Sequence, residues 1–495
     1  MDNNLKVRFA PSPTGPFHIG GARSALFNWL VARKNHGTML LRIEDTDQDR
    51  SKPEWEENIK NALKGLGIDW DEGVDVGGPN GPYRQMERLD IYKKYTDKLL
   101  AEGKAYYCYC TPEELEAERE ELKAQGKMPR YMGKCRNLTP EQRAQYEAEG
   151  RKPTVRFRVP EGQDIVVHDM VRGDVHFESD GIGDFIIVKE DGIPTYNYAV
   201  VIDDALMKVN MVIRAEEHLS NTPRQLLLYD ALGFEKPKFG HISLILGKDK
   251  KKMSKRHGAT SVDQYRQLGY LPDAIVNFLA LLGWAPNSEQ EIFSREELIA
   301  QFDMAHVAKN PAVFDIEKLN WLNAHYMRQM TDEEYIAFAK PFMIQAGYMT
   351  GEETGDKAEW LNKVILTAKD QAEYGAQIPG CVEMYFNDEF DFEVDEEKGV
   401  HAVDALKAET VPTVIASFLA KLQAAETLDH ASVKAMFKAV QKETKLGGKF
   451  VFMPVRVALT GNQHGPELAE MIPLLGAERV TKRIQASLKK AGISL

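Results

Sequence analysis

The order of elements predicted for the first 43 residues limits the fold of this 495-residue chain more than any other feature. Residues 5–9 are predicted to form a short buried strand, and Pro11, Pro13 and Gly15 force a loop after them. A helix is predicted from about Gly21, and residues 38–43 form the next apolar strand. This order indicates a parallel α/β sheet, in which ligands bind beyond the carboxyl ends of the strands. Glu44 follows directly after such an end.

Two polar stretches far apart in the sequence indicate a site for ATP. The turn His18-Ile19-Gly20-Gly21 opens into the first helix, whose free backbone N–H groups favour a phosphate. The segment Lys252-Met253-Ser254-Lys255 supplies cations that a triphosphate needs while it is cleaved. Alone, each has an ordinary interpretation, a turn histidine without a ligand and a solvated charged loop. Together they predict two halves of one site.

Composition excludes few function classes. The net charge of −12 argues against nucleic-acid binding by the whole surface, although residues 248–256 hold six cations and one carboxylate. No apolar run approaches the roughly 18 residues of a membrane span, and the N-terminus lacks the pattern of a secretory signal. We therefore expect a cytoplasmic protein that does not bind a membrane.

The pattern changes twice along the chain. From about residue 84, helices with Thr caps alternate with strand-like runs, so residues 84–197 are interpreted as an α+β module inserted into the nucleotide-binding sheet of residues 1–83 and 198–258. Within the module, residues 164–168 and 174–178 predict a hairpin, and residues 242–246 are predicted to return to the sheet as a strand. After residue 258 the patterns are helical, and an acidic stretch at 388–398 is predicted to separate two helical bundles.

The four cysteines are spaced unevenly. Cys108, Cys110 and Cys135 are close in sequence, whereas Cys381 is alone. In a reducing compartment this is a metal pattern more than a disulfide framework. Cys108 and Cys110 lie in a strand-like run, where alternate residues share a face, so both sulfurs can reach one ion.

Several segments resemble the class I glutamyl-tRNA synthetases of bacterial type. The resemblance begins with residues 8–15, 18–23 and 42–47, and it continues in order through residues 194–197, 201–204, 212–218, 221–225 and 454–461. One residue departs from the general class I pattern, because Gly21 stands where most class I tetrapeptides end in histidine. Glycine at this position is common in the glutamate-specific members.

The resemblance implies a fold and a domain order. It implies a Rossmann-type parallel-sheet catalytic domain (1–83 and 198–258) with an inserted α+β acceptor-binding domain (84–197). A stem-contact domain (259–328) and an all-α anticodon-binding half in two helical domains (329–385 and 386–495) would follow. The implied partners are glutamate tRNA, with glutamine tRNA as an open possibility, and the chain is expected to be a monomer. Residues 442–449 and Arg456 are candidate RNA contacts, although each is also typical of a solvated charge.

The resemblance also implies a reaction and its residues. L-Glutamate attacks ATP to give a glutamyl adenylate, the 3′ end of the tRNA takes the glutamyl group, and AMP and diphosphate leave; Mg²⁺ is the expected bridging ion. Arginine suits a carboxylate because its planar fork can form two bonds. The implied catalytic residues are His18, Lys252 and Lys255, the glutamate-binding residues are Arg8, Ser12, Glu44, Tyr196 and Arg214, and the ATP-binding residues are His18, Gly20, Gly21, Glu217, Lys252, Met253, Ser254 and Lys255.

Zinc is a further possibility raised by the resemblance. Some relatives bind structural zinc with a histidine two residues past the third cysteine, where this chain has Asn137, a poor zinc ligand. Tyr131, four residues before Cys135, is the substitute that we consider, because related enzymes use a tyrosine at that spacing. A lost site with three free thiols is the alternative.

Three other functions would leave different marks in the sequence. A glutaminyl-tRNA synthetase would carry Pro-Glu-Pro-Asn-Gly near the N-terminus, the complete class I tetrapeptide and a largely β C-terminal half. A truncated relative that modifies a tRNA base would lack the helical half. A non-catalytic RNA-binding paralogue should have lost His18, Lys252 or Lys255, and all three are present.

Overall fold

A computed structural model describes residues 4–254, 258–395 and 399–493 of the chain. It divides into two compact units, one made of residues 1–267 and 272–319 and the other of residues 268–271 and 320–495. Among the residues that the model describes, none of the helices combines the length and the apolar character needed to cross a membrane.

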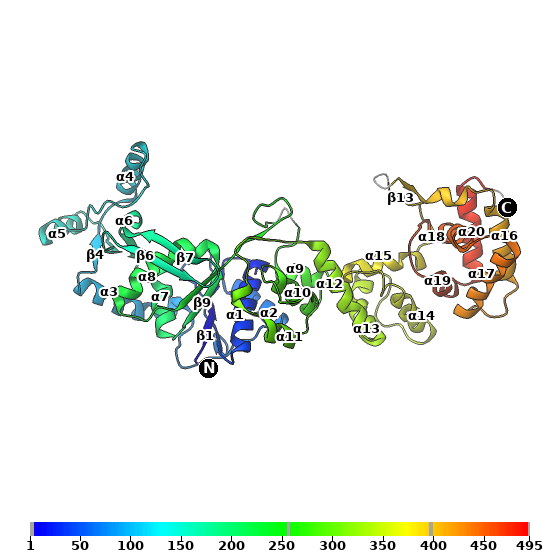
Figure 1. The fold of residues 1–495 in the computed structure, drawn as a ribbon, viewed down its shortest axis with the longest axis horizontal. Coiled ribbons are helices and arrows are strands. Elements are labelled where there is room, and N and C mark those ends of the chain that lie inside the picture. Colours follow the sequence, from blue (N-terminus) through cyan, green and yellow to red (C-terminus); the bar gives the residue numbers. More distant parts are fainter. Residues whose placement is uncertain (1–3, 255–257, 396–398, 494–495) are drawn as a thin grey trace. The chain divides into compact units, whose positions relative to one another are not determined.

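The first unit begins with the predicted parallel sheet. Strands β1 (Lys6–Phe9) and β2 (Thr38–Leu41) pair in parallel, and β3 (Glu72–Gly73) follows β2 in the same direction. Helices α1 (Ile19–Lys34) and α2 (Pro53–Gly65) make the crossovers, and α1 packs against β1 (Figure 1). The backbone N–H of Asn210 donates to the carbonyl of Lys6 at 3.1 Å, which brings β9 beside β1. The predicted strand–helix–strand order is therefore confirmed.

A second sheet has the order β7-β6-β10-β9. Strands β9 (Met211–Ala215) and β10 (Lys238–Ile242) pair in parallel and are connected through a 3-10 turn (Glu216–Asn221) and α8 (Thr222–Leu232). The sequence predicted this strand at 242–246, which was wrong, because the run Lys238-Phe239-Gly240-His241-Ile242 contains a buried histidine and a glycine that conceal it. The more apolar residues that follow form only the short β11 (Ile245–Leu246).

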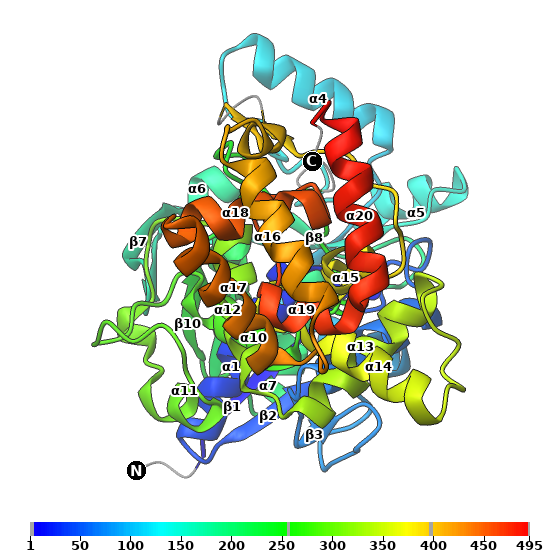
Figure 2. The ribbon, with the colours of Figure 1, turned by 90° about the vertical axis from the view of Figure 1, so that its right-hand side faces the viewer.

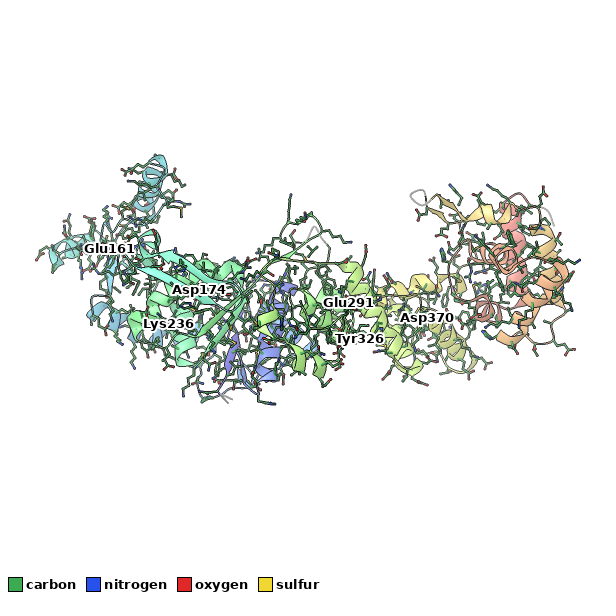
Figure 3. The ribbon with its side chains drawn as sticks, viewed as in Figure 1. Glu161, Asp174, Lys236, Glu291, Tyr326 and Asp370 are labelled. Atoms are coloured by element: carbon green, nitrogen blue, oxygen red, sulfur yellow. The ribbon has the colours of Figure 1, made fainter. Side chains whose placement is uncertain are left out.

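The predicted hairpin is confirmed as β6 (Asp164–Asp169) and β7 (Gly173–Glu178), which pair antiparallel. Sequence analysis placed it inside the inserted module, yet the end of β6 pairs in parallel with β10 at Asp169 and Phe239. The boundaries 84–197 thus remain a prediction, and within them this hairpin extends the sheet of β9 and β10. Asp174 on β7, and Glu161 before β6, are labelled in Figure 3.

The rest of the inserted module is a three-stranded antiparallel sheet with helices around it. The sheet order is β4 (Ala105–Cys108), β5 (Thr154–Phe157) and β8 (Phe185–Val188). Helices α4 (Pro112–Ala124) and α5 (Pro140–Ala148) begin with the predicted capping boxes of Thr111 with Glu114 and Thr139 with Gln142. The other helices here are α3 (Leu89–Ala101), α6 (Ser179–Ile182) and α7 (Tyr196–Leu206).

The chain after residue 258 is mostly helical, as predicted. Strand β12 (Ala312–Val313) pairs with β11, and the helices near it are α9 (Val262–Gln267), α10 (Pro272–Leu281), α11 (Arg295–Gln301) and α12 (Ile316–Gln329). The second unit then contains α13 (Asp332–Gln345), α14 (Gly355–Leu366), α15 (Ile378–Val382), a hairpin of β13 (Val394–Asp395) and β14 (Val400–His401), α16 (Val411–Gln423), α17 (His430–Thr444), α18 (Gly448–Thr460), α19 (Leu468–Leu475) and α20 (Ala477–Lys490).

One connected cluster of buried apolar side chains runs through the second unit, from Met327 to Leu488. Helices α16 and α17 pack on each other, and α18 packs on α20 (Figure 2). The acidic stretch 388–398 lies partly outside the described residues, and its Asp388 accepts a hydrogen bond from Nε of Arg483 on α20 at 2.8 Å. Because the apolar cluster includes residues on both sides of this stretch, a division into two bundles there stays a prediction.

Candidate active site

The first unit contains an open pocket of about 810 Å³ at the carboxyl ends of β1, β2 and β9. Nearly all of the predicted site residues line it. They are Arg8, Ser12, Glu44, Tyr196 and Arg214 from the predicted glutamate set, and His18, Gly20, Gly21, Glu217, Lys252 and Met253 from the predicted ATP set. Ser254 is not among the lining residues, and Lys255 falls outside the residues that the structure describes.

His18 is the N-cap of α1. Its Nδ1 accepts a hydrogen bond from the backbone N–H of Gly20 at 3.0 Å, so the neutral ring carries its proton on Nε2. Burial, and next the charge of Lys252, lowers the pKa of His18. The ring is therefore a neutral donor beside the N–H of Gly21, which no described residue accepts, whereas the N–H groups of Ile19, Gly20 and Ala22 are bonded. This arrangement is suited to a phosphate oxygen.

Packing against Phe17 explains why residue 21 is a glycine in this structure. A Cβ atom at position 21 would lie 2.8 Å from the ring of Phe17, closer than such contacts occur. Phe17 in turn makes an edge contact with Phe9 at the end of β1, with ring centroids 5.8 Å apart. A histidine at position 21 would require this aromatic pair to move.

Lys252 follows β11 in a tight loop. The backbone N–H of Gly247 donates to the carbonyl of Lys251 at 2.9 Å, and Met253 N–H donates to Ile245 at 3.2 Å. The Lys252 ammonium forms an ion pair with Glu217 at 2.6 Å, and its side chain is 65% exposed. The loop backbone is thus fixed while the cation remains open to water.

Arg8, at the end of β1, is held by a buried carboxylate. Its Nε donates to both oxygens of Asp204 on α7, at 3.2 and 3.3 Å. No described residue accepts a hydrogen bond from its two Nη atoms, although Arg8 lines the pocket. The fork end of this guanidinium is therefore available to a carboxylate.

Arg42 links Asp204 to Glu44. It pairs with Asp204 at 2.8 Å and with Glu44 at 3.2 Å, and all three side chains are buried. Burial raises the pKa of Glu44, and Arg42 and Arg8 only partly offset this effect. Burial would also raise the pKa of Asp204, but Arg8 and Arg42 hold it below its ordinary value. Of Arg42, Asp204 and Glu44, it is Glu44 that lines the pocket, so its carboxylate is suited to an ammonium group.

Arg214, on β9, is surrounded by acceptors. Its Nε donates to Nε2 of His241 at 3.1 Å and its Nη1 donates to the Tyr196 hydroxyl at 3.2 Å. Its Nη2 donates to Thr222 at 2.9 Å and to Gln225 at 2.8 Å. Of five N–H groups, four are engaged by described residues, which leaves one on Nη1. The predicted two-bond grip on a carboxylate therefore fits Arg8 better than Arg214.

Tyr196 connects Arg214 to a histidine of the 3-10 turn. Because its hydroxyl accepts from Arg214, it donates to Nδ1 of His218, 3.2 Å away. Burial and the positive charges of Arg214 and Arg8 lower the pKa of His218 to about 4. His218 is therefore a neutral acceptor near pH 7.

Sequence reasoning missed the residues that hold the site together, chiefly Asp204, Arg42, His218 and His241. One signal was present: the pair Asp203-Asp204 lies in an otherwise apolar helix, where buried carboxylates require partners. Asp204 pairs with Arg8 on β1 and with Arg42 directly after β2, whereas Asp203 pairs with Arg88 and accepts from Tyr92. These partners are far away in the chain, so no spacing in the sequence identifies them.

The predicted metal ligands also lie together, in the inserted module. Sγ of Cys110 is 3.5 Å from Sγ of Cys135, and the Tyr131 hydroxyl is 3.5 Å from Sγ of Cys108 and 3.7 Å from Sγ of Cys110. Ligands of one tetrahedral zinc ion are separated by roughly 3.5–3.8 Å at the usual bond lengths. Hydrogen bonding with Cys110 and then Cys135 lowers the pKa of Cys108.

Asn137, by contrast, accepts a hydrogen bond from Arg158 at 3.3 Å. Cys381 is in the second unit, among the residues packed on its apolar cluster. The donor set of three sulfurs and one phenol oxygen therefore fits a zinc ion.

Comparisons with known proteins agree with this architecture. Residues 4–321 match a family model described as the catalytic domain of class I tRNA synthetases (E and Q), and residues 334–488 match an anticodon binding domain. The chain is 57% identical to a glutamate–tRNA ligase of Desulforamulus reducens over 98% of this chain and 100% of that protein. It is 55% identical to one of Carboxydothermus hydrogenoformans, with 97% and 99% covered.

Solved structures give the same result. The crystal structure of the glutamate–tRNA synthetase from Elizabethkingia anophelis is similar, with a TM-score of 0.85, 34% identity and coverage of 98% of this chain and 100% of that one. A glutamate tRNA ligase from Elizabethkingia meningosepticum, solved in complex with its amino acid, gives a TM-score of 0.84 at 34% identity, with 98% and 99% covered.

Proposed function

The chain belongs to the glutamate–tRNA ligases, a family of class I tRNA synthetases, and on that premise we propose that the pocket of the first unit is where it activates glutamate. The enzyme joins L-glutamate to the 3′ end of glutamate tRNA for protein synthesis and uses ATP as a substrate. The observation that carries the proposal is the convergence of Arg8, Arg214 and Glu44 with His18 and Lys252 on one pocket.

The proposed chemistry needs no protein nucleophile. The glutamate carboxylate attacks the α-phosphate of ATP, the glutamyl adenylate forms, and diphosphate leaves. His18 and the N-terminus of α1 are proposed to bind phosphate oxygens, and Lys252 is proposed to stabilise the charge that develops on the diphosphate. Mg²⁺ is proposed to enter with the ATP phosphates. A role for Lys255 is proposed from the family pattern alone.

Recognition of glutamate is proposed to divide among three groups. Arg8 offers its free fork to one carboxylate, Arg214 offers a charge and one N–H, and Glu44 receives the ammonium. Ser12 and Tyr196 complete the lining. Glutamine would leave one arginine facing a neutral amide, and a site with unsatisfied polar groups can discriminate by about 10⁴.

The test is aminoacylation with labelled glutamate and, separately, glutamine, each against glutamate tRNA and glutamine tRNA. Charging of glutamate tRNA with glutamate is the expected result. Diphosphate exchange should depend on tRNA, so exchange at the full rate without tRNA would contradict the assignment. Charging of glutamine tRNA would show the broader of the two possible tRNA ranges.

We also propose that Cys108, Cys110, Cys135 and Tyr131 hold one structural zinc ion, which would fix the loops after β4. The close approach of three sulfurs and one phenol oxygen supports it. Protein purified without chelators should contain about one zinc per chain, and Cys135→Ser should lose it. Cys381→Ser is the matched control, which should retain it. Absence of zinc from the unaltered protein would contradict the proposal.

RNA contacts in the second unit are proposed for Lys442, Lys445 and Lys449. All three are exposed, and no described residue pairs with them. Arg456 instead donates to the carbonyl of Pro466 at 2.8 Å, so it is better explained as a structural residue. Loss of the three lysine charges should raise the KM for tRNA and leave the KM for glutamate unchanged.

A monomeric state and a cytoplasmic location are proposed as well. Sedimentation tests the monomeric state.

A further inference from the structure

His241, on β10, lies directly behind the pocket and is completely buried. Its Nε2 lies 3.1 Å from Nε of Arg214, and its Nδ1 lies 2.6 Å from Oδ2 of Asp169 at the end of β6. Neither His241 nor Asp169 lines the pocket. The three side chains form a line that starts at the hairpin of β6 and β7 and ends at a residue of the proposed glutamate site.

The partners of His241 fix its proton. Nε of an arginine can only donate, so Nε2 of His241 must present its lone pair to it. The Thr222 hydroxyl also lies 3.1 Å from Nε2, and it can donate to the same lone pair. The Asp169 carboxylate accepts, so Nδ1 carries the hydrogen. Asp169 also accepts the backbone N–H groups of Val171 and Arg172, at 2.9 and 2.8 Å. These donors keep the carboxylate ionised in a buried position.

The electrostatics agree with this assignment. Burial lowers the pKa of His241, and the hydrogen bond to Asp169 only partly offsets the effect. Burial would raise the pKa of Asp169, but the bond to His241 and the backbone donors hold it below its ordinary value. The pair is therefore a neutral imidazole and a carboxylate.

The contact with His241 determines how the Arg214 guanidinium is rotated. Thr222 and Gln225 accept from Nη2, and Tyr196 accepts from Nη1. The acceptor on Nε completes the set, so the one remaining N–H can point in a single direction. A proton on Nε2 of His241 would place two donors face to face and would turn Arg214 away from this orientation.

We propose that Asp169 and His241 are positioning residues for glutamate binding: Asp169 fixes the tautomer of His241, and His241 orients the guanidinium of Arg214 toward a carboxylate of the substrate. This inference rests on the proposed role of Arg214. It predicts that the tautomer of a side chain outside the pocket sets the KM for glutamate.

Two substitutions at position 241 separate this role from a merely structural one. In His241→Gln, Oε1 takes the place of Nε2 and still accepts from Arg214, while the bond to Asp169 is lost. In His241→Asn, the amide reaches only the Nδ1 position, so it can donate to Asp169 and leaves Arg214 Nε without a partner. If His241 served only to attach the hairpin, the asparagine variant would be the milder one.

The experiment measures KM for glutamate, KM for ATP and kcat in aminoacylation by the full-length enzyme. His241→Asn should raise the KM for glutamate by about tenfold or more, and His241→Gln by less than about threefold. The KM for ATP should change by less than about twofold in both. A larger effect from glutamine than from asparagine, equal effects, or a shift confined to ATP would overturn the proposal.

Asp169→Asn tests the same inference without a substitution at position 241, so it can be used even if the His241 variants do not fold. The asparagine oxygen retains the backbone N–H groups of Val171 and Arg172, and the bond from the backbone N–H of His241 to Oδ2 is lost. The NH₂ then faces Nδ1 of His241, so the ring proton should move to Nε2. Histidine ¹⁵N NMR should report this exchange, together with a KM for glutamate raised about tenfold or more. A changed tautomer with an unchanged KM would refute the inference, as would an unchanged tautomer.

Arg214→Gln distinguishes a failure of the proposed role of Arg214 from a failure of the positioning role of Asp169 and His241. If this variant retains the KM for glutamate of the unaltered enzyme, the proposed role of Arg214 fails. If it raises that KM while His241→Asn and Asp169→Asn do not, the role of Arg214 stands and only the positioning inference fails.

Discussion

The two ends of the pocket are built differently. At the amino-acid end, Arg8, Arg42 and Arg214 are buried, and they are fixed by buried carboxylates or neutral acceptors. At the phosphate end, Lys252 is exposed and pairs with Glu217. Under the proposed roles, the groups that select glutamate are organised in advance by the fold, whereas the charge on the phosphates is met by an exposed side chain.

The largest effect on stability should come from removing a buried charge at the amino-acid end of the pocket. Asp204→Asn removes the charge that Arg8 and Arg42 share, and losing one member of a buried ion pair destabilises a protein by roughly 3–5 kcal/mol. Urea unfolding should show this loss, and the KM for glutamate should rise. Asp97→Asn, in an exposed pair on α3, is the control and should leave stability almost unchanged. Equal stability of the two variants would mean that the buried network contributes little.

At the phosphate end we expect a large effect on rate and little effect on stability. Lys252→Ala should lower kcat for adenylate formation by about 10², the scale of losing one preorganised transition-state donor. The KM for glutamate and the melting temperature should change little, because the side chain is exposed. Lys248→Ala, in the same loop and paired with Glu317, is the control. If Lys252→Ala lowered the melting temperature as much as Asp204→Asn, the proposed difference between the two ends would be wrong.

The two ends should also respond differently to acid. Because the pKa of Glu44 is raised, its carboxylate takes up a proton at a higher pH than an ordinary glutamate, and the proposed ammonium site then loses its anion. The pKa of His18 is lowered, so this ring takes up a proton at a lower pH than an ordinary histidine. The KM for glutamate should therefore rise as pH falls, by up to about tenfold. A Glu44→Gln enzyme should show a raised KM without this pH dependence.

The smallest effect concerns Gly21. Gly21→Ala places a methyl group against Phe17, and overpacking of this kind costs about 1–3 kcal/mol, partly offset by the helix propensity of alanine. Thermal unfolding should show a net loss of about 1 kcal/mol. Gly15→Ala is the matched control, because a Cβ there meets no atom within 4 Å. If both variants were equally stable, the aromatic pair at the phosphate turn would be more adaptable than we expect.

The sequence predicted the phosphate turn, the parallel order of β1 and β2, and the gathering of the cysteines with Tyr131, because each depends on local spacing or on a known family pattern. It did not predict the strand around His241, since a buried polar residue in a strand has the same pattern as a loop until its partner is known. Asp169 is 72 residues away from it in the chain. The contacts that orient the site are of this long-range kind, which explains why the lining was predictable and its supports were not.

Four of the five N–H groups of Arg214 are engaged, and under its proposed role this has a consequence for how the enzyme could change its substrate. His241, Tyr196, Thr222 and Gln225 each receive a hydrogen bond from the one guanidinium. Replacing Arg214 with a smaller neutral residue would strand these buried acceptors at once, at a cost of about 1–3 kcal/mol for each that finds no new donor. The first single substitution toward recognition of a neutral amino acid would therefore already destabilise the protein. The charge of Arg214 would favour an acidic substrate, and the stability lost on replacing Arg214 would oppose a change of that preference.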